Sequence, residues 1–261
     1  MTEDQMLTAC DLLYHHWSEG SRMEALPEHL RPASRAEGYA IQAHIERYTQ
    51  RPLFGWKIAA TSEAGQAHIG VDGPLAGRIL AERVIEDGGR CKLSNSLMRA
   101  TELEFAFRMA ADLPPRDHPY SEEQVLDAVA SLHPAIELPD SRYHNFETAG
   151  LAQLLADNAC AHLFILGPAA DPAWREIDLA QHHVEGIING RTSCTGVGAN
   201  VLGNPRTALT WLANELSRHG LMLNAGQVVT TGTCVVPMTI APGDRIEGNF
   251  GPLGNVAVSI D

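Results

Sequence analysis

The spacing of hydrophobic and polar positions changes along the chain, and this change predicts where helices give way to strands. In the first fifty residues, apolar side chains such as Leu13 and Trp17 lie at helical spacing. Thr2 and Gln5 form a capping-box pattern that predicts the start of the first helix. From Leu53 onward, short apolar runs are separated by Gly, Pro and Asp, which is typical of strands joined by turns.

Capping residues predict two further helices. Ser121, with Gln124 three positions later, predicts a helix whose apolar positions continue as far as Leu132. Asn204 followed by Pro205 predicts the start of another helix, because proline fits the first helical turn. Strands are predicted at residues 53–60, 135–138, 161–166, 228–231, 235–240 and 256–260.

The order of these elements indicates the fold class. Helices are few after residue 50, and strands do not alternate regularly with them, which disfavours a doubly wound parallel sheet. An α+β fold with a β-rich core is favoured instead. The sequence has no internal repeat and no linker-like tract. We therefore expect an N-terminal helical appendage at residues 1–50 and a β-rich domain at residues 51–261, together forming one continuous structural unit.

Composition narrows the classes of partner. Among 261 residues, 32 Asp and Glu outnumber 19 Lys and Arg, which gives a net charge of −13. This acidity, with no dense basic run, argues against a nucleic-acid partner. The chain has no stretch of about 18 uncharged apolar residues, so no membrane span is expected. The five cysteines show no CxxC spacing, which predicts a protein of the reducing cytoplasm.

Residues 102–107, Glu-Leu-Glu-Phe-Ala-Phe, are the most informative segment of the chain. On a strand, alternate side chains share a face, so Glu102 and Glu104 would point one way and the large apolar residues the other. Taken alone, this pattern is equally typical of a surface strand with a solvated acidic face. Two carboxylates placed so close together repel each other unless they face water or share a cation.

A third glutamate favours the shared cation. Glu137 lies in the apolar run Ala-Ile-Glu-Leu at residues 135–138, where a lone buried carboxylate would be costly. Three glutamates on two strands suit a hard dication such as Mg²⁺ or Mn²⁺, which prefers oxygen ligands. The pattern therefore indicates a candidate metal site formed by Glu102, Glu104 and Glu137.

A series of short segments, in order along nearly the whole chain, carries a family resemblance. These segments are Gly55-Trp56-Lys57-Ile58, Thr61-Ser62, Glu102-Leu103-Glu104, Ala135-Ile136-Glu137, Ala156-Asp157-Asn158-Ala159, Gly198 to Pro205, Trp211-Leu212-Ala213, Ala225-Gly226-Gln227 and Thr231-Gly232-Thr233. With them the chain resembles the 2-oxopent-4-enoate (2-hydroxypentadienoate) hydratases and 4-oxalocrotonate decarboxylases of the fumarylacetoacetate hydrolase superfamily. Because the segments recur in order, the resemblance is more specific than any one motif.

The resemblance implies a mixed β-roll with an N-terminal helical segment, and a catalytic domain at residues 51–261. It implies that Glu102, Glu104 and Glu137 hold Mg²⁺ (or Mn²⁺), and that the first two belong with Lys57 to the catalytic residues. Lys57 would move a proton near the metal, whereas a surface lysine on a half-exposed strand is the alternative. A small 2-oxo acid substrate and a homo-oligomeric enzyme are also implied.

Three more residues are candidate substrate ligands. By resemblance Asn158 lines the site, although Asx residues between elements ordinarily cap turns. Thr233, next to a glycine that lets a ligand approach the backbone, is a candidate donor to a substrate carboxylate. Arg78, expected after a turn at Gly77, could bind a distal anionic group, and an exposed loop arginine is the alternative.

The activity implied by the resemblance is metal-dependent addition of water to a 2-hydroxy-2,4-dienoate. The product would be a 4-hydroxy-2-oxo acid, formed in the catabolism of aromatic compounds. Ala59, Leu75 and Asn204 stand where the family often has glycine, aspartate and histidine. The alternatives are decarboxylation of a 2-oxo-enedioate of the 4-oxalocrotonate type, C–C bond hydrolysis of an acylpyruvate, and non-catalytic binding of a 2-oxo acid by a pseudo-enzyme.

Overall fold

The computed structural model, which describes residues 1–93 and 96–261, contains two β-sheets. The strands are β1 (Gly55–Ala59), β2 (Leu75–Ile79), β3 (Val84–Glu86), β4 (Arg90–Cys91), β5 (Ala100–Met109), β6 (Val129–Leu138), β7 (Leu163–Leu166), β8 (His183–Ile188), β9 (Arg191–Val197), β10 (Val228–Thr233), β11 (Met238–Thr239), β12 (Arg245–Asn249) and β13 (Asn255–Ile260). The helices are α1 (Glu3–Glu19), α2 (Arg35–Ala43), α3 (Glu63–Ile69), α4 (Glu122–Asp127), α5 (Leu151–Ala156) and α6 (Pro205–Arg218), with short 3₁₀ turns between them.

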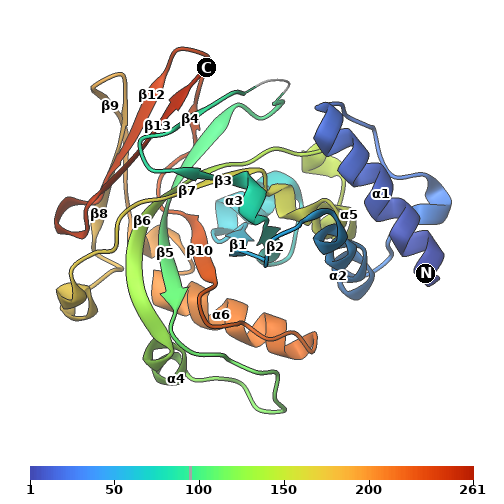
Figure 1. Ribbon diagram of the computed structural model, residues 1–261, viewed down its shortest axis with the longest axis horizontal. Coiled ribbons are helices and arrows are strands. Elements are labelled where there is room, and N and C mark those ends of the chain that lie inside the picture. The colour runs from blue at the N-terminus through green and yellow to red at the C-terminus, as the bar shows by residue number, and fades with distance from the viewer. Residues whose placement is uncertain (94–95) are drawn as a thin grey trace.

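Both sheets mix parallel and antiparallel pairs. The larger sheet has the order β2-β1-β10-β5-β6-β7-β3, with β11 paired to β5, and the smaller has the order β4-β13-β12-β8-β9. The pairs β1–β10, β3–β7 and β4–β13 are parallel, and the other pairs are antiparallel. Figure 1 shows α1, α2 and α5 gathered on one side and the smaller sheet on the other. This arrangement agrees with the predicted α+β class.

The main core lies between the two sheets and α6. On β5 the alternation predicted from the sequence is confirmed, because Leu103 and Phe105 are buried in this core while Ala106 belongs to a small cluster on the opposite face. Ile246 of the smaller sheet and Leu212 of α6 complete the packing around β5. A strand with both faces covered is the setting in which an acidic side chain becomes buried.

The N-terminal helices have an apolar cluster of their own. Trp17 of α1 and Ile41 at the end of α2 belong to it, and the predicted capping box of Thr2 is present at the start of α1. The side-chain amide of Gln42 donates to the carbonyl oxygens of Ala76 and Leu155, each at 2.9 Å. This buried amide joins α2 to β2 and to α5.

The helix predicted from Ser121 to Leu132 is shorter than expected. Its capping box with Gln124 is present, but α4 ends at Asp127 and β6 begins at Val129. Residues 129–132 extend because they pair with the end of β5, where Phe107 lies opposite Leu132. Pairing with a distant strand therefore overrides the local helical spacing. The helix predicted at Asn204-Pro205 is confirmed as α6, with the Asn204 side chain as its cap.

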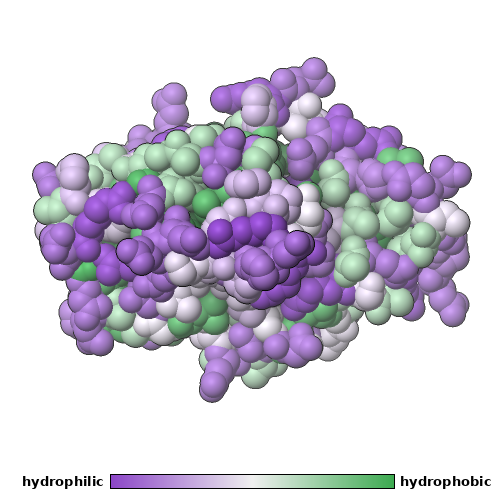
Figure 2. Space-filling model, turned by 90° about the horizontal axis from the view of Figure 1, so that it is seen from below, coloured by the Kyte–Doolittle hydropathy of each residue, from purple (hydrophilic) through white to green (hydrophobic). Residues whose placement is uncertain are grey.

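The surface is mixed in character. Figure 2 shows hydrophilic residues over much of one face, with smaller hydrophobic areas between them. Within the described ranges, the helices are too short or too polar to cross a membrane.

Candidate metal and catalytic site

Neighbouring strands of the larger sheet bring three glutamates together. In the antiparallel pair β5–β6, Glu102 lies directly opposite Glu137, and Glu104 lies two residues further along β5 on the same face. One carboxylate oxygen of each residue lies within 4.8 Å of those of the other two. We call Glu102, Glu104 and Glu137 the carboxylate cluster. The alternation read from the sequence and the register of the two strands together produce this arrangement.

Two members of the cluster are buried, which contradicts the alternative of a solvated acidic face. Glu104 is 0% and Glu137 is 2% exposed, whereas Glu102 is partly exposed. Burial, together with the neighbouring charge of Glu102, raises the pKa of Glu104 to about 7, although the Lys57 ammonium and two hydrogen bonds act in the opposite direction. Burial likewise raises the pKa of Glu137 well above its usual range. Carboxylates in such surroundings call for a nearby cation.

One oxygen of Glu104 is held by groups on β10. The Thr230 hydroxyl and the Gly232 N–H both donate to Glu104 Oε2, the latter at 2.8 Å. The pairing of β10 with β5 is irregular between Thr230 and Thr233, and Gly232 has φ +99° within this bulge. A Cβ atom at position 232 would overlap Thr61. Sequence reasoning missed Thr230, and the glycine inside a threonine-rich strand was the available signal.

Lys57 is buried beside the cluster, so the alternative of a surface lysine is wrong. Its Nζ lies 2.9 Å from Glu137 Oε2 and donates to the Ala159 carbonyl oxygen at 3.1 Å. Burial by itself would lower the pKa of Lys57, but the negative charges of the cluster outweigh it and raise that pKa above its ordinary value. Lys57 is therefore an ammonium group at neutral pH.

The donor set fits a hard divalent cation. Glu104 Oε1 and both carboxylate oxygens of Glu137 are buried and have no hydrogen-bond partner among the described residues, although Glu137 Oε2 is ion-paired with Lys57. When ionised, three carboxylates and one ammonium leave two negative charges uncompensated. Oxygen-only ligands with this excess of charge suit Mg²⁺ or Mn²⁺ better than softer metals.

Arg78 lies away from the cluster. The sequence predicted that it follows a turn at Gly77, but it lies within a strand. It is on β2, 2% exposed, and it points to the face opposite Lys57, because the cross-strand partner of Lys57 is Gly77. Its guanidinium pairs with Glu46 at 2.7 Å and lies over the ring of Trp56. These contacts indicate a structural role for Arg78 and do not support anion binding.

The other two candidate substrate ligands differ in their surroundings. Asn158 is 1% exposed, and both ends of its side-chain amide bond to the backbone of Arg78. Thr233 lies across from Glu104 on the neighbouring strand, and its hydroxyl donates to the Val235 carbonyl oxygen at 2.8 Å. Thr233 is therefore near the cluster, whereas the amide of Asn158 is already in use.

Known proteins share both the sequence and the fold of this chain. Residues 81–260 match the family described as fumarylacetoacetate (FAA) hydrolase C-terminal. A protein of Dechloromonas aromatica (strain RCB), named 2-keto-4-pentenoate hydratase 1, is 32% identical over 252 residues, which is 95% of this chain and 94% of that protein. A 4-oxalocrotonate decarboxylase of Pseudomonas sp. (strain CF600) is 34% identical over 227 residues, 85% of this chain and 84% of that protein.

A solved structure extends the comparison to three dimensions. The structure of 4-oxalocrotonate decarboxylase from Pseudomonas putida G7, complexed with magnesium and adipate, superimposes with a TM-score of 0.91. The match covers 100% of this chain and 99% of that chain at 28% identity. The two chains therefore have the same fold over their whole length.

Proposed function

Because the chain belongs to the fumarylacetoacetate hydrolase family, we propose that it is a metal-dependent hydratase of 2-hydroxy-2,4-dienoates acting in the catabolism of aromatic compounds. Its product would be a 4-hydroxy-2-oxo acid. The observation that carries the proposal is the buried carboxylate cluster with the Lys57 ammonium beside it. Relatives named 2-keto-4-pentenoate hydratase match the chain almost from end to end, which supports this class of substrate.

The chain divides the chemistry between two groups. A dication held by the carboxylate cluster would supply Lewis-acid polarisation of the carboxylate and 2-oxo oxygens of the substrate. Lys57, an ammonium in this environment, is the proton donor in our proposal. Thr230 and the Gly232 N–H hold Glu104 in one orientation, and the burial of Glu104 keeps bulk water away from its carboxylate.

Substrate contacts are assigned more narrowly than the sequence suggested. Thr233 remains our candidate donor to the substrate carboxylate because it lies across from Glu104; its hydroxyl would turn from the Val235 carbonyl oxygen to donate to the substrate. The contacts of Arg78 and Asn158 support structural parts for both, so neither is included among the substrate ligands.

Decarboxylation of a 2-oxo-enedioate is the second candidate, and Leu75 favours it. Leu75 is buried on β2, two residues from the glycine that faces Lys57. An aspartate at this position would add a second proton-transfer group, which leucine cannot replace. Loss of CO₂ needs no activated water, so the site as it stands meets its requirements. The likeness to 4-oxalocrotonate decarboxylase is further support.

A single assay separates these reactions. Purified protein with Mg²⁺ is mixed in turn with 2-hydroxypenta-2,4-dienoate, 2-oxohex-3-enedioate and an acylpyruvate, and the loss of absorbance is followed while products are identified by NMR. The proposal expects a 4-hydroxy-2-oxo acid from the dienoate, no activity with chelator, and none in Glu104→Gln. Release of CO₂ from the enedioate alone would establish the second candidate. Binding of oxalate without turnover of any substrate would contradict both.

The same proposal includes the organisation of the protein. We propose that the fold is a mixed β-roll, with residues 1–50 as a helical appendage to the catalytic domain at residues 51–261. The separate apolar cluster of the N-terminal helices supports this division. We also propose a homo-oligomer in the cytoplasm. The five free cysteines fit a reducing compartment. Light scattering of the purified protein tests the oligomer.

A further inference from the structure

The second contact of the Lys57 ammonium comes from a strained turn. The Ala159 carbonyl oxygen accepts from Lys57 Nζ at 3.1 Å, and Ala159 lies in the three-residue turn Asn158–Cys160. The φ angles of these residues are +54°, +51° and +60°. Successive non-glycine residues rarely adopt left-handed backbone, because Cβ approaches the following carbonyl oxygen too closely. Such a turn persists only where its surroundings hold it, and it is often found at functional sites.

Asn158 fastens this turn to β2 through both ends of its side-chain amide. Asn158 Oδ1 accepts from the Arg78 N–H at 2.6 Å, and Nδ2 donates to the Arg78 carbonyl oxygen at 2.8 Å. A neighbouring strand would use the same two backbone groups of β2. Position 77 is glycine, and a Cβ atom there would overlap the Asn158 carbonyl oxygen. The turn therefore depends on the side-chain amide of Asn158 and on the lack of a side chain at Gly77.

We propose that Asn158 is a positioning residue for Lys57. It holds the left-handed turn against β2, and the turn presents the Ala159 carbonyl as a fixed acceptor that sets where Lys57 Nζ lies beside Glu137. The inference rests on the proposed function only in giving Lys57 the part of proton donor.

The number of donors on the ammonium explains why this contact matters. A lysine ammonium has three N–H donors. One serves the Ala159 carbonyl oxygen, and the charge of the ammonium pairs with Glu137 Oε2 at 2.9 Å. The hydrogen bond and the ion pair together set the direction of the N–H groups that are left for a substrate. Without the Ala159 contact, the flexible four-carbon chain of Lys57 would sample other directions.

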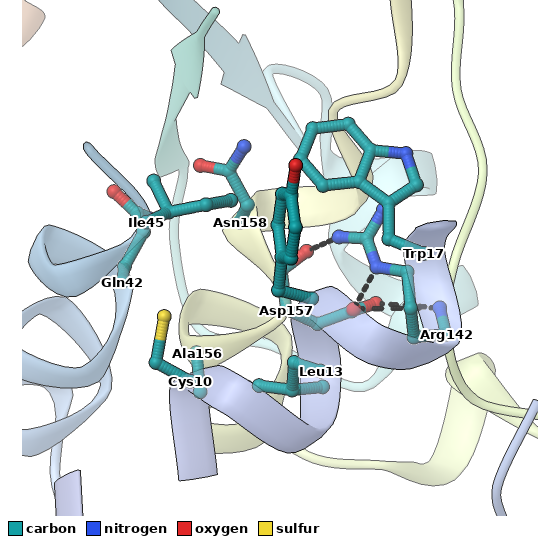
Figure 3. A pocket seen from close by; sticks show the side chains of 10 residues that line it. Cys10, Leu13, Trp17, Gln42, Ile45, Arg142, Ala156, Asp157 and Asn158 are labelled. Carbon is teal, nitrogen blue, oxygen red and sulfur yellow. Dashed lines mark hydrogen bonds and ion pairs between the residues drawn. The ribbon is translucent and has the colours of Figure 1, made fainter. Parts of the chain in front are cut away.

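In this proposal Asn158 acts through Lys57, because its amide is bonded at both ends to the backbone of Arg78. Its neighbour Asp157 points to a different side, where it meets Arg142, as Figure 3 shows. Asn158 thus acts on the site, whereas the adjacent Asp157 stabilises the surrounding structure.

The test compares two asparagines that make the same pair of bonds. Asn214 of α6 accepts from the Tyr120 N–H at 2.7 Å and donates to the Tyr120 carbonyl oxygen at 3.0 Å, and neither residue belongs to the site. Asn158→Asp keeps the acceptor and loses the donor, and Asn158→Leu loses both. The same two changes at Asn214 are the matched controls. Gly77→Ala would displace the turn as well, but its Cβ atom would also lie 3.2 Å from Lys57 Cγ, so Asn158→Asp carries the test if Asn158→Leu does not fold.

A spectroscopic readout is available because the chain contains only two lysines, the buried Lys57 and the exposed Lys92. Lysine labelled with ¹³C at Cε therefore gives two NMR signals, with Lys92 as an internal reference. We expect the Asn158 variants and Gly77→Ala to shift or broaden the Lys57 signal, with Lys92 unchanged and the Asn214 variants without effect. We expect kcat to fall about 10²-fold in the Asn158 variants, with KM changed less than about twofold.

The outcomes distinguish this inference from the proposed function. An unchanged Lys57 signal in the Asn158 variants would overturn it, as would an equal loss of kcat in the Asn214 variants. A raised KM with unchanged kcat would make Asn158 a substrate ligand and would also overturn it. Wild-type protein without activity on any 2-oxo acid would contradict the proposed function, while the lysine spectra would still decide whether Asn158 positions Lys57.

Discussion

Two groups of buried charge lie close together in the chain but are built differently. The carboxylate cluster has three acidic groups for one ammonium, and three of its buried oxygens have no hydrogen-bond partner among the residues the structure describes. The second group, which we call the arginine–aspartate network, consists of Arg22, Asp140, Ser141, Arg142 and Asp157, with two positive and two negative charges. The first group is incomplete because its negative charge is in excess, whereas the second group is balanced in charge.

The contacts within the network show how its buried charges are paired. The Arg142 guanidinium pairs with Asp157 (Figure 3). It also donates to the carbonyl oxygens of Asp140 and Ala161, at 2.8 and 3.1 Å. The Ser141 hydroxyl donates to the same Asp157 carboxylate at 2.7 Å. Buried charges arranged in this way are compensated inside the fold. Burial of charged groups alone therefore does not indicate a functional site, whereas burial of charges without partners of opposite sign does.

The largest expected effect separates the two groups by activity. Glu104→Gln removes a charge from the cluster and keeps its size, so we expect turnover to fall by about 10⁴ or more, which corresponds to more than about 5 kcal/mol in activation free energy. The free energy of unfolding should stay the same or rise, because a poorly compensated buried charge is lost. Steady-state rates and urea unfolding measure both. Substantial activity in this variant would remove the cluster from the mechanism.

The opposite result is expected in the network. Arg142→Leu leaves the buried Asp157 carboxylate without its partner, so we expect the free energy of unfolding to drop by about 3–5 kcal/mol. Urea unfolding at pH 7 measures the loss. Arg90→Leu is the control, because it removes a surface pair with Asp261 that should contribute little. If the two substitutions destabilise the protein equally, the network is not the structural element described here.

Metal addition should stabilise the wild-type protein through the cluster alone. A ligand that binds only the folded state, present at about 100 times its Kd, raises the free energy of unfolding by about 2.7 kcal/mol. We therefore expect Mg²⁺ or Mn²⁺ to raise the melting temperature of chelator-stripped protein. The rise should disappear in Glu104→Gln and persist in the Asn214 control variants. An equal rise in Glu104→Gln would show that the metal binds elsewhere.

The smallest expected effect is the pH dependence of the metal-free protein. Burial raises the pKa of Glu104 from 4.5 to about 7, so between these values the folded chain holds a proton that the unfolded chain releases. The contribution to stability is complete below pH 4.5 and is lost as the pH rises through 7, by about 1–3 kcal/mol. Urea unfolding in chelator from pH 5.5 to 8 should show this decline in wild type and a weaker one in Glu104→Gln. Parallel curves would contradict it.

Local patterns were enough to predict part of the site. The alternation of residues 102–107 placed Glu102 and Glu104 on one face, and the apolar run around Glu137 indicated a buried strand. Both signals depend on neighbours in sequence, because side chains on a strand alternate with a period of two. The resemblance to a known family then brought Lys57 into the same site.

The remaining features depend on contacts between distant segments. Leu132 is in a strand because β5 pairs with it, although its local spacing is helical. Arg78 is buried because β2 turns it toward the N-terminal helices, and the glycine before it faces Lys57 within a strand instead of forming a turn. The bond from Thr230 to Glu104 requires strands that are more than a hundred residues apart. No local pattern carries such information.

The central claim is that the incomplete group of charges is a metal-dependent catalytic centre. The most direct test titrates Mn²⁺ into chelator-stripped protein and measures bound ion by electron paramagnetic resonance and consumption of the dienoate in the same samples. We expect activity to rise in proportion to bound Mn²⁺ and to level off at one ion per chain, with binding at least about 100-fold weaker in Glu104→Gln. Full activity without bound metal, or undiminished binding in Glu104→Gln, would contradict it.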